Sequence, residues 1–487
     1  MTDTASPSGT GARAADGGLA LALLVAGTFF MENLDATVIT PAIPAMAESF
    51  AARPVDLNTG VSAYMLTVGA FIPISGWAAE RFGARPVLGF AITLFTLASL
   101  LCGLAGSLPV FVASRILQGI GGALMVPVGR LVVLRATPKE RLIAAIATLT
   151  WPALVAPVLG PPLGGLLVEH GDWRWIFYLN LPLGLVALAL TPMIVPAGGA
   201  NRASRFDWPG FLSMGGALFC LMLVAEMLSR PGPDWARILA AAALGLGLLL
   251  WGTRHIGRAA HPVFDLSALR LPSFAVTIWG GSLFRMGVSA VPFLLPLLFQ
   301  IGFGFDPLAA GLMLMAVFAG NLAMKPMTTP VIRRFGFRPV LVVNGLLNAG
   351  LIAAIAGFSA GMPLALACAL LFLGGMTRSM QFTALNTIAF ADVPDRDMTS
   401  ANTLFSTVFQ LAMGLGVALG AVAWRAGEAL AGGGDPAMPF RIAFLLVALV
   451  ALVGVIDSAR LHAEAGARVA RRGDAKSDGP GAESPAD

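Results

Sequence analysis

Glu80-Arg-Phe-Gly-Ala-Arg-Pro-Val-Leu88 is the stretch that decides the fold, because the chain repeats it as Arg333-Arg-Phe-Gly-Phe-Arg-Pro-Val-Leu341. The two copies are identical at seven of nine positions, and each stands in a short basic loop between apolar runs. Chance similarity between short basic loops is the alternative. Duplication of a larger unit explains the match better, because internal repeats are typical of duplicated architectures. We therefore predict two homologous halves.

The chain outside these loops consists mainly of apolar runs that are long enough to cross a bilayer. About 20 helical residues, at a rise of about 1.5 Å each, span the ~30 Å hydrocarbon core. Only a helix pairs all its backbone N–H and C=O groups within one such segment. We predict an all-α polytopic membrane protein with fourteen spans, at about residues 18–42, 57–79, 86–107, 109–131, 142–167, 175–197, 207–229, 235–253, 272–300, 307–331, 339–359, 361–388, 399–424 and 439–460.

Composition and charge agree with this prediction. Hydrophobic residues make up 57% of the 487 residues and charged residues 12%, whereas a soluble domain carries about 25% charged residues. The net charge of +5 does not indicate a nucleic-acid partner, because most Lys and Arg residues stand in short loops on one side of the spans. This asymmetry predicts that both termini are cytoplasmic. We expect residues 1–17 and 461–487 to be disordered cytoplasmic ends.

The position of the repeat also divides the chain. Its two copies lie eight predicted spans apart, whereas two six-span halves alone would place them six apart. Two spans must therefore be inserted between the halves. We predict an N-terminal six-helix bundle at residues 18–200, two inserted helices and a linker at 201–270, and a C-terminal six-helix bundle at 271–460.

Ionisable residues within the predicted spans carry the most functional information. A charge at bilayer depth costs about 2.5–3.5 kcal/mol, so it usually faces a cavity or a partner. The residues of this kind are Glu32, Asp35, Arg115, Glu226, Arg285, Lys325 and Arg378. Glu226 falls in the inserted segment, where we expect a structural or interfacial role.

Glu32 and Asp35 are three residues apart and share one helical face. Two carboxylates this close do not ionise together easily, so one of them is expected to hold a proton near neutral pH. Such a group can load a proton on one side of a membrane and release it on the other. The pair is therefore a candidate site of proton transfer.

Polar residues of the second half recur at helical spacing. Asn321 and Lys325 are four residues apart, and Arg378 and Gln381 are three apart, while Arg285 shares a face with two serines. This spacing indicates helices that line water. The alternative is that the basic side chains snorkel or cap helix carbonyls.

Five motifs, in chain order, resemble the major facilitator superfamily. Within it they resemble the fourteen-span drug:proton antiporter branch of the EmrB/QacA type, with a likeness to MdtD-type exporters. The motifs are Leu34-Asp35-Ala-Thr37-Val38 with Ile43-Pro44, Gly76-Trp-Ala-Ala-Glu80-Arg81-Phe-Gly83-Ala-Arg85, Arg115-Ile-Leu-Gln118-Gly119-Ile-Gly121-Gly122, Gly160-Pro161-Pro162-Leu-Gly164-Gly165, and Trp173-Arg174-Trp175-Ile-Phe177 followed by Asn180-Leu-Pro182. The chain departs from the pattern at Glu80, where Asp is usual, and at Ala156-Pro157, where the longer fifth-span motif has glycine.

The resemblance implies the major facilitator fold, in which the first, fourth, seventh and tenth core helices line a central cavity. It implies that Asp35 is the proton-coupling acid, that Arg115 is its partner, and that Glu32 is a second proton site or a substrate contact. A static Asp35–Arg115 pair that braces the helices is the alternative. The substrate-cavity candidates are Gln118, Arg285, Asn321, Lys325, Arg378 and Gln381.

Two further motifs are candidate moving parts. The gating-loop candidates are Gly76, Glu80, Arg81, Gly83 and Arg85, and the candidates for an antiporter motif are Gly160, Pro161, Gly164 and Gly165. The loop is expected to latch the halves in one conformation through charge-assisted contacts, and the alternative is that it only sets topology. The fifth-span motif is expected to bend the helix and seal the halves, and the alternative is an ordinary packed helix.

These observations predict a proton-coupled exporter of drugs or metabolites in a bacterial cytoplasmic (inner) membrane. We expect a monomer among membrane lipid that binds a small-molecule substrate, with no cofactor and no metal. No Gly-x-x-x-x-Gly-Lys-Ser/Thr loop for ATP occurs in the sequence, so the proton gradient would supply the energy. The sequence leaves open whether the protein has partners in the outer membrane.

Three alternatives remain. The intramembrane charges sum to a positive value even with both acids of the first span ionised, which favours an anionic substrate such as a carboxylate or its metal chelate. An importer or uniporter of the same fold is less consistent with the fifth-span motif. A membrane sensor would need a folded output domain, and an intramembrane enzyme would need a nucleophile–base pair or metal cluster that the sequence does not indicate.

Overall fold

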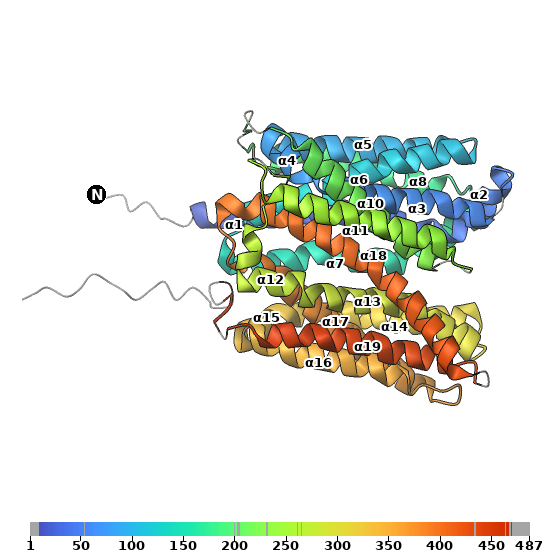
Figure 1. The fold of residues 1–487 in the computed structure, drawn as a ribbon. Coiled ribbons are helices and arrows are strands. Elements are labelled where there is room, and N and C mark those ends of the chain that lie inside the picture. The colour runs from blue at the N-terminus through green and yellow to red at the C-terminus, as the bar shows by residue number, and fades with distance from the viewer. Residues whose placement is uncertain are drawn as a thin grey trace, which may run out of the picture.

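The computed structural model describes residues 9–469, except 53, 199, 202–204, 230, 231, 261, 264, 433, 434, 463, 467 and 468. Long helices run side by side between two common ends (Figure 1). The first helix begins at Gly9, earlier than the predicted start at residue 18, because the preceding residues continue the same helix. The predicted disorder of residues 1–8 and of 470–487 lies outside the described residues.

The helices before the predicted insertion form one group, which we call the N-terminal group. Its bounds are α1 (Gly9–Val38), α2 (Ile43–Ser49), α3 (Pro54–Phe71), α4 (Ile74–Phe82), α5 (Ala84–Leu104), α6 (Leu108–Ala136), α7 (Leu142–His170), α8 (Trp175–Tyr178) and α9 (Asn180–Ile194). The 3₁₀ turns η1 (Thr40–Ala42) and η2 (Lys139–Arg141) connect them. Within the group α1 packs on α7, α6 and α9, and α6 packs on α3 and α5.

The helices after the insertion form the C-terminal group. Its bounds are α12 (Pro272–Ile278), α13 (Gly280–Leu297), α14 (Pro307–Ala323), α15 (Lys325–Phe335), α16 (Phe337–Ile355), α17 (Leu364–Ala391), α18 (Met398–Ala431) and α19 (Met438–Ala459). The turns η3 (Ser267–Arg270), η4 (Leu298–Gly302) and η5 (Asp395–Asp397) complete it. Here α13 packs on α18 and α19, and α17 packs on α14 and α16.

Each predicted span coincides with one helix or one bent helix pair. Among the described residues eleven helices are long and apolar enough to cross a membrane, and thirteen are if the bent pairs α3–α4 and α14–α15 each count as one span. The predicted span at 142–167 falls on α7, where several side chains lie outside the described residues. The fold is therefore all-helical as predicted, while the count of fourteen and the division into six, two and six stay predictions.

The repeated stretch takes the same local structure in both copies. Gly83 joins α4 to α5 with φ 88° and ψ 144°, and Gly336 joins α15 to α16 with φ 78° and ψ 172°. Residues with a Cβ atom rarely adopt this backbone conformation, so glycine is required at both turns. In each copy the next helix begins at the residue that follows the glycine, and the arginine stands second in that helix.

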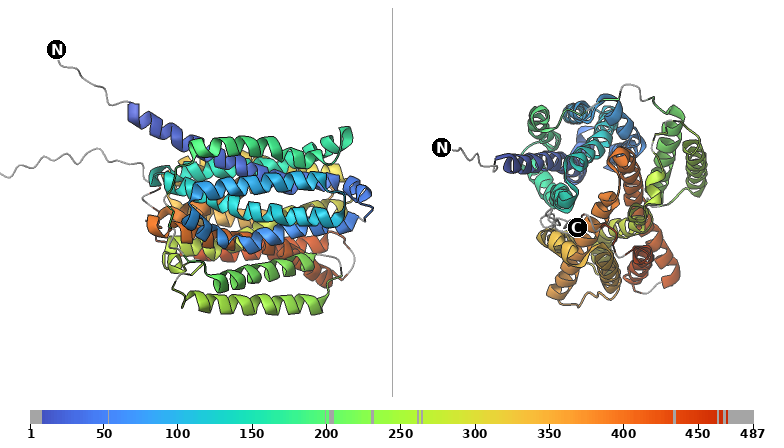
Figure 2. Two further views of the ribbon diagram at one scale, coloured as in Figure 1. Left: turned by 90° about the horizontal axis from the view of Figure 1, so that it is seen from above. Right: turned by 90° about the vertical axis from the view of Figure 1, so that its left-hand side faces the viewer.

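The two predicted inserted helices are α10 (Trp208–Ser229) and α11 (Trp235–Ile256). Helix α10 packs on α3 of the N-terminal group and on α18 of the C-terminal group, and α11 packs on the outside of α10 (Figure 2). Ser62 of α3 donates a hydrogen bond of 2.6 Å to Glu226 of α10. Glu226 therefore has the interfacial position that the sequence predicted.

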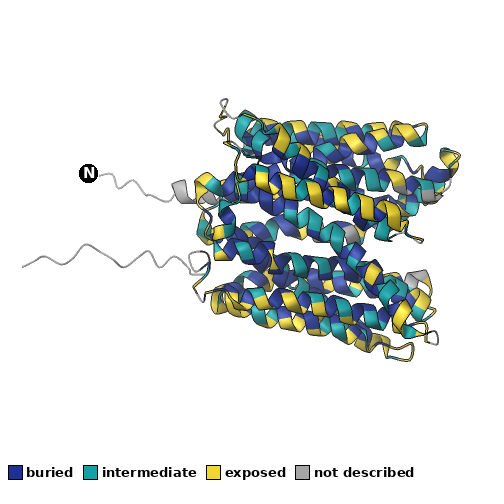
Figure 3. Cartoon of the chain, in the orientation of Figure 1, coloured by how far each residue is buried: buried dark blue, intermediate teal, exposed yellow. Residues whose placement is uncertain are grey.

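Buried side chains occupy the interior of each group, and exposed apolar side chains cover the outside (Figure 3). Leu239, Leu244 and Leu250 of α11 are examples of large apolar residues that are about half exposed or more. Such a surface is favourable in lipid, where apolar side chains have nothing to gain from burial. The distribution of burial agrees with a membrane-embedded bundle.

One end of the bundle carries the loops at residues 83, 137–141, 336 and 392–397, and we call it the basic end. Lys139 there donates to the backbone oxygens of Phe390 and Val393 at 2.8 and 3.0 Å. Asn402 donates to the Pro127 oxygen at 2.8 Å, and Arg135 donates to Thr399. These bonds join the N-terminal to the C-terminal group, so the two groups are closed against each other at the basic end.

Close helix packing gives a test of the fold. A Cβ at Gly375 of α17 would lie 2.0 Å from the Val317 oxygen of α14, whereas a Cβ at the adjacent Gly374 would meet nothing within 4 Å. Gly375→Val should therefore destabilise the detergent-solubilised protein by about 1–3 kcal/mol, measured as a lower midpoint of thermal unfolding. Gly374→Val is the matched control, and equal losses in the two variants would contradict the packing described here.

Candidate functional site

A buried polar cluster lies inside the N-terminal group. Arg115 of α6 donates to Asp35 of α1 at 2.6 Å and to Gln118 at 2.5 Å, and both charged side chains are fully buried. Gln118 and Asn180 of α9 each donate to the second Asp35 oxygen at 2.9 Å. Ser99 of α5 accepts from the Gln118 amide at 2.8 Å. We call these five residues the Asp35 cluster.

The Asp35 cluster satisfies both oxygens of its carboxylate. A buried ion pair needs such additional hydrogen bonds, because desolvation otherwise exceeds the attraction between the charges. This geometry agrees with the alternative in which a static Asp35–Arg115 pair braces the helices. Gln118, a predicted cavity residue, is fully buried in the same cluster. Whether Asp35 also carries a coupled proton stays a prediction.

Glycines of the fourth-span motif bring the helices together at this cluster. A Cβ at Gly119 would lie 2.9 Å from the Tyr64 oxygen of α3, and a Cβ at Gly121 would lie 2.8 Å from the Phe95 nitrogen of α5. Only glycine allows backbones to approach this closely. The motif around Arg115 therefore positions the guanidinium by removing side chains near it.

Glu32 lies beside the cluster without joining it. A Cβ at Gly122 of α6 would lie 3.5 Å from the Glu32 carboxyl carbon and 3.2 Å from the Tyr64 hydroxyl, so both groups lie against Gly122. The Glu32 Oε2 atom is buried and makes no hydrogen bond to the described residues. Glu32 is partly buried as a residue, and a buried oxygen without a partner is costly for the anion, so this acid differs from Asp35, whose two oxygens are both hydrogen-bonded.

The fifth-span motif packs α7 against the acid-bearing helix. A Cβ at Gly160 would lie 2.2 Å from the Thr37 hydroxyl, and one at Gly164 would lie 2.3 Å from the Val38 oxygen. A Cβ at Gly165 would meet nothing within 4 Å. Helix α7 continues through Pro161 without a break. The motif thus sets a close α1–α7 contact within one group, and its role as a seal stays a prediction.

A second set of buried charges lies between the groups. Arg285 of α13 donates to the Thr277 oxygen at 2.8 Å and to Asn386 at 3.1 Å. Lys325 at the start of α15 donates to Thr150 of α7 at 2.7 Å and to Thr383 of α17 at 3.1 Å. Arg285 caps a helix carbonyl, as the alternative predicted, whereas Lys325 bridges the two groups.

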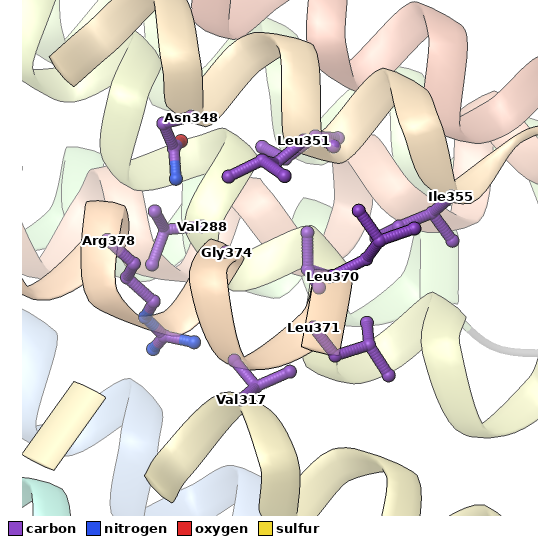
Figure 4. A pocket seen from close by; sticks show the side chains of 11 residues that line it. Val288, Val317, Asn348, Leu351, Ile355, Leu370, Leu371, Gly374 and Arg378 are labelled. Atoms are coloured by element: carbon purple, nitrogen blue, oxygen red, sulfur yellow. The ribbon is translucent and has the colours of Figure 1, made fainter. Parts of the chain in front are cut away.

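Arg378 lines a cavity inside the C-terminal group. The cavity is small, with a volume of about 30 Å³, and lies between α13, α14, α16 and α17, with aliphatic walls that include Val317 and Leu371 (Figure 4). Asn348 stands at one side of it. One terminal nitrogen of the Arg378 guanidinium is buried without a hydrogen bond to the described residues.

The remaining cavity candidates lie within the same group. Gln381 donates to the Leu341 oxygen at 3.0 Å and accepts from Asn344 at 3.0 Å, so it joins α17 to α16. Asn321 is buried, and its backbone faces Gly375 of α17. The predicted cavity residues thus lie at several separate places in the bundle, and their role as substrate contacts stays a prediction.

The gating-loop residues meet their neighbours mainly through the backbone. A Cβ at Gly76 would lie 2.2 Å from the Thr403 hydroxyl of α18, which brings the two groups together. The Glu80 oxygen accepts from the Asn201 nitrogen at 2.8 Å, and Arg85 donates to the Pro192 oxygen at the end of α9. Arg81 lies in the last turn of α4.

Sequence reasoning missed one buried cation. Arg130 of α6 has its guanidinium 4.9 Å from the Phe405 ring and 5.8 Å from the Phe409 ring of α18. The predicted span ended at residue 131, which made this arginine look like a flanking loop charge. Helix α6 continues to Ala136, so Arg130 lies within the bundle. An unbroken apolar pattern after Arg130 was the signal that could have revealed it.

The helical bundle and its buried ion pairs define a polytopic membrane protein, and three comparisons with known proteins narrow this class. The model of the Major Facilitator Superfamily matches residues 25–417 and 277–477. The "Putative multidrug resistance protein MdtD" of Salmonella paratyphi A is 38% identical over 401 residues, which cover 81% of this chain and 84% of that protein. The protein of the same name from Klebsiella pneumoniae is 39% identical with the same coverage.

Two solved structures share the fold at low sequence identity. The proton:xylose symporter XylE, bound to 6-bromo-6-deoxy-D-glucose, matches with a TM-score of 0.62 and 15% identity over 91% of this chain and 95% of XylE. The human organic anion transporter MFSD10 (TETRAN) matches with a TM-score of 0.66 and 15% identity over 91% of this chain and 99% of MFSD10. The chain belongs to the major facilitator superfamily and is a membrane transporter, as the five motifs predicted.

The Asp35 cluster gives a test of its own. Arg115→Ala leaves a buried carboxylate without its counter-charge, which costs about 3–5 kcal/mol, whereas replacing both members of a buried pair is often close to neutral. We therefore expect Arg115→Ala to lower the thermal unfolding midpoint strongly and the double variant Asp35→Asn/Arg115→Met to recover most of the loss. A double variant that is less stable than the single one would show that the pair does not brace α1 against α6.

Proposed function

We propose that this transporter is a proton-coupled secondary exporter that exchanges a small-molecule substrate for protons by alternating access. The observation that carries the proposal is the acid pair on α1. Asp35 has a cation and two amides around it, whereas the buried Glu32 oxygen has no partner among the described residues. In this conformation the Glu32 carboxyl then holds a proton, because the neutral acid is far less costly to bury than the anion.

Alternating access is supported by the kind of contact that closes the basic end. Lys139, Asn402 and Arg135 join the two groups through hydrogen bonds at this end, next to apolar side chains of both groups that pack together. Such bonds exchange readily for bonds to water when the groups separate. The basic end, which loop charges predict to be cytoplasmic, can therefore open to take up substrate while the opposite end closes.

The direction of transport and the breadth of substrates are argued from the relatives. The proteins that match over 81% of this chain carry a name that refers to multidrug resistance, and resistance requires that a compound leave the cell. We accordingly propose export from a bacterial cytoplasmic membrane by a single chain, with the proton gradient as the energy source and no bound cofactor.

Proton flux in proteoliposomes tests this proposal. Addition of a transported probe should drive protons across the membrane in wild-type vesicles that contain a pH-sensitive dye. Glu32→Gln and Asp35→Asn should each lower this flux at least about tenfold, because each removes a carboxyl from the pair that is proposed to carry the proton. Glu226→Gln, which alters an acid on α10 instead, is the matched control and should keep the flux.

Two results would count against the proposal. Substrate transport without any proton movement in the wild type would make the chain a uniporter. Full proton flux in both Glu32→Gln and Asp35→Asn would remove the α1 acids from the coupling mechanism.

A second candidate function is export specialised for an anion. Four cations within the bundle, the buried Arg285 and Lys325 and the partly buried Arg130 and Arg378, lack a carboxylate within ion-pair distance among the described residues. A buried cation without a counter-charge attracts an anionic solute. A carboxylate or its metal chelate would supply the missing charge on binding.

A substrate panel separates the two candidates. Lys325→Ala and Arg378→Ala should reduce the efflux of di- and tricarboxylates far more than that of tetraphenylphosphonium, because they remove positive charge. Uptake into inverted vesicles at fixed pH gradient is the measurement. A greater loss for the lipophilic cation would eliminate the anion candidate and leave drug export.

A further inference from the structure

We propose that Arg130 is a switching counter-ion for Glu32. Phe405, Phe409 and Ser406 of α18 hold its guanidinium while the basic end is closed. When α18 moves away, the released guanidinium pairs with Glu32 and expels the proton from that carboxyl. This inference rests on the proposed proton coupling and names the residue that makes proton release depend on conformation.

The first step is the set of contacts that α18 makes with the Arg130 guanidinium. The guanidinium carbon lies 4.9 Å from the centre of the Phe405 ring and 5.8 Å from that of the Phe409 ring. Its Nη1 atom donates to the Ser406 hydroxyl at 3.3 Å. Cation–ring contacts become stronger when water is excluded from them. Arg130 belongs to the N-terminal group, so all three contacts depend on the position of the other group.

The same two rings also contact a second cation, Arg285 of α13, which belongs to the C-terminal group as the rings do. The Arg285 guanidinium carbon lies 5.0 Å from the Phe405 ring and 5.1 Å from the Phe409 ring. Arg130 and Arg285 carry like charges that interact. Their repulsion opposes the closed arrangement, and the rings and hydrogen bonds hold it together. Arg285 has additional partners on α12 and α17, whereas Arg130 is the more easily released of the two.

The second step is the path from Arg130 to Glu32. The Arg130 guanidinium carbon lies 5.9 Å from the Phe29 ring, and Phe29 is one turn before Glu32 on the same face of α1. Helical side chains lean toward the N-terminus of their helix. On α6 this direction leads from Arg130 toward Gly122, against which Glu32 lies. The charges of Glu32 and Arg130 already interact in the closed arrangement.

The third step is the absence of a competing cation. Among the described residues, the charged and titratable groups around Glu32 and its neighbour Tyr64 are Asp35 on the same helix as Glu32, and Arg115 and Arg130 on α6. Arg115 is held by Asp35 at 2.6 Å and stacks on Tyr64 at 4.4 Å. Arg130 is therefore the cation near Glu32 whose partners belong to a moving element.

The proton balance follows from these positions. In the closed arrangement Glu32 is a neutral carboxylic acid and Arg130 is a cation on the rings. When the basic end opens, the O–H bond of Glu32 breaks, its proton passes to water at the open end, and the carboxylate pairs with Arg130. One proton leaves for each opening, and the charge of Arg130 does not change.

Carbodiimide labelling of Glu32 in liposome-embedded protein tests the switch without a substrate. Dicyclohexylcarbodiimide modifies protonated carboxyl groups, so mass spectrometry of the Glu32 peptide from about pH 5 to pH 9 gives a labelling midpoint. Arg130→Gln should raise the midpoint by about one pH unit or more, because an opposite charge nearby favours the carboxylate by about that amount. Arg130→Lys should restore most of the wild-type midpoint.

The double variant Phe405→Leu/Phe409→Leu should move the midpoint in the opposite direction. Loss of the rings frees Arg130 in the closed protein, so the carboxyl should lose its proton at lower pH. Arg334→Gln is the control, since it removes an exposed cation from the ring of Phe335 at the basic end, and it should leave the midpoint within about half a unit. Thermal unfolding of each variant verifies folding.

Opposite shifts support the switch. An unchanged midpoint in Arg130→Gln, or shifts of both variants in the same direction, overturns it. Proton flux by the wild type separates this outcome from failure of the proposed function. If the wild type moves protons but the labelling midpoint does not shift in the variants, only the Arg130 switch is contradicted. If the wild type moves no protons, the proposed proton coupling itself is contradicted.

Discussion

Burial of charge inside an apolar bundle is the constraint on which the rest of this structure depends. The Asp35 carboxylate meets it in full, because both of its oxygens are hydrogen-bonded, and Arg115 meets it through one terminal nitrogen and the ring of Tyr64. Glu32 and Arg130 lack a counter-charge of this kind, and in our proposal the acid is neutral while aromatic rings hold the cation. The paired charges fix helices in place, whereas the proposal lets Glu32 and Arg130 change partners.

Much of the fold followed from local sequence, because membrane helices obey a simple rule of length and hydropathy. The repeat around Gly83 and Gly336 predicted two similar turns, and the structure has the same unusual backbone at both. Helix ends were harder to predict. The segment before residue 18 and the segment after residue 131 both continue their helices, because a helix does not stop where the bilayer does.

The candidate site was predictable in its members and less so in their arrangement. Asp35, Arg115 and Gln118 do meet, as motifs on two helices suggested. Asn180 belongs to the Asn180-Leu-Pro182 stretch of the fifth motif, although nothing in the sequence linked it to Asp35. Ser99, which completes the cluster, is a common polar residue with no spacing signal. Which polar residues face one another across helices depends on helix rotation, and a single sequence does not encode rotation in any readable pattern. The interactions between the two groups were unpredictable for the same reason.

The inserted helix α10 touches both moving groups, and the chemistry of that contact has a mechanical meaning. Met222 projects against Gly69 of α3 on one side and against Gly414 of α18 on the other. The Met222 side chain is long and unbranched, and the two glycines that it contacts have no side chains. It can therefore change rotamer as the helices slide past it, with little loss of dispersion energy. The inserted helix pair therefore contacts both groups through a side chain that can adjust as the groups move relative to each other. It also separates the interface between the groups from lipid.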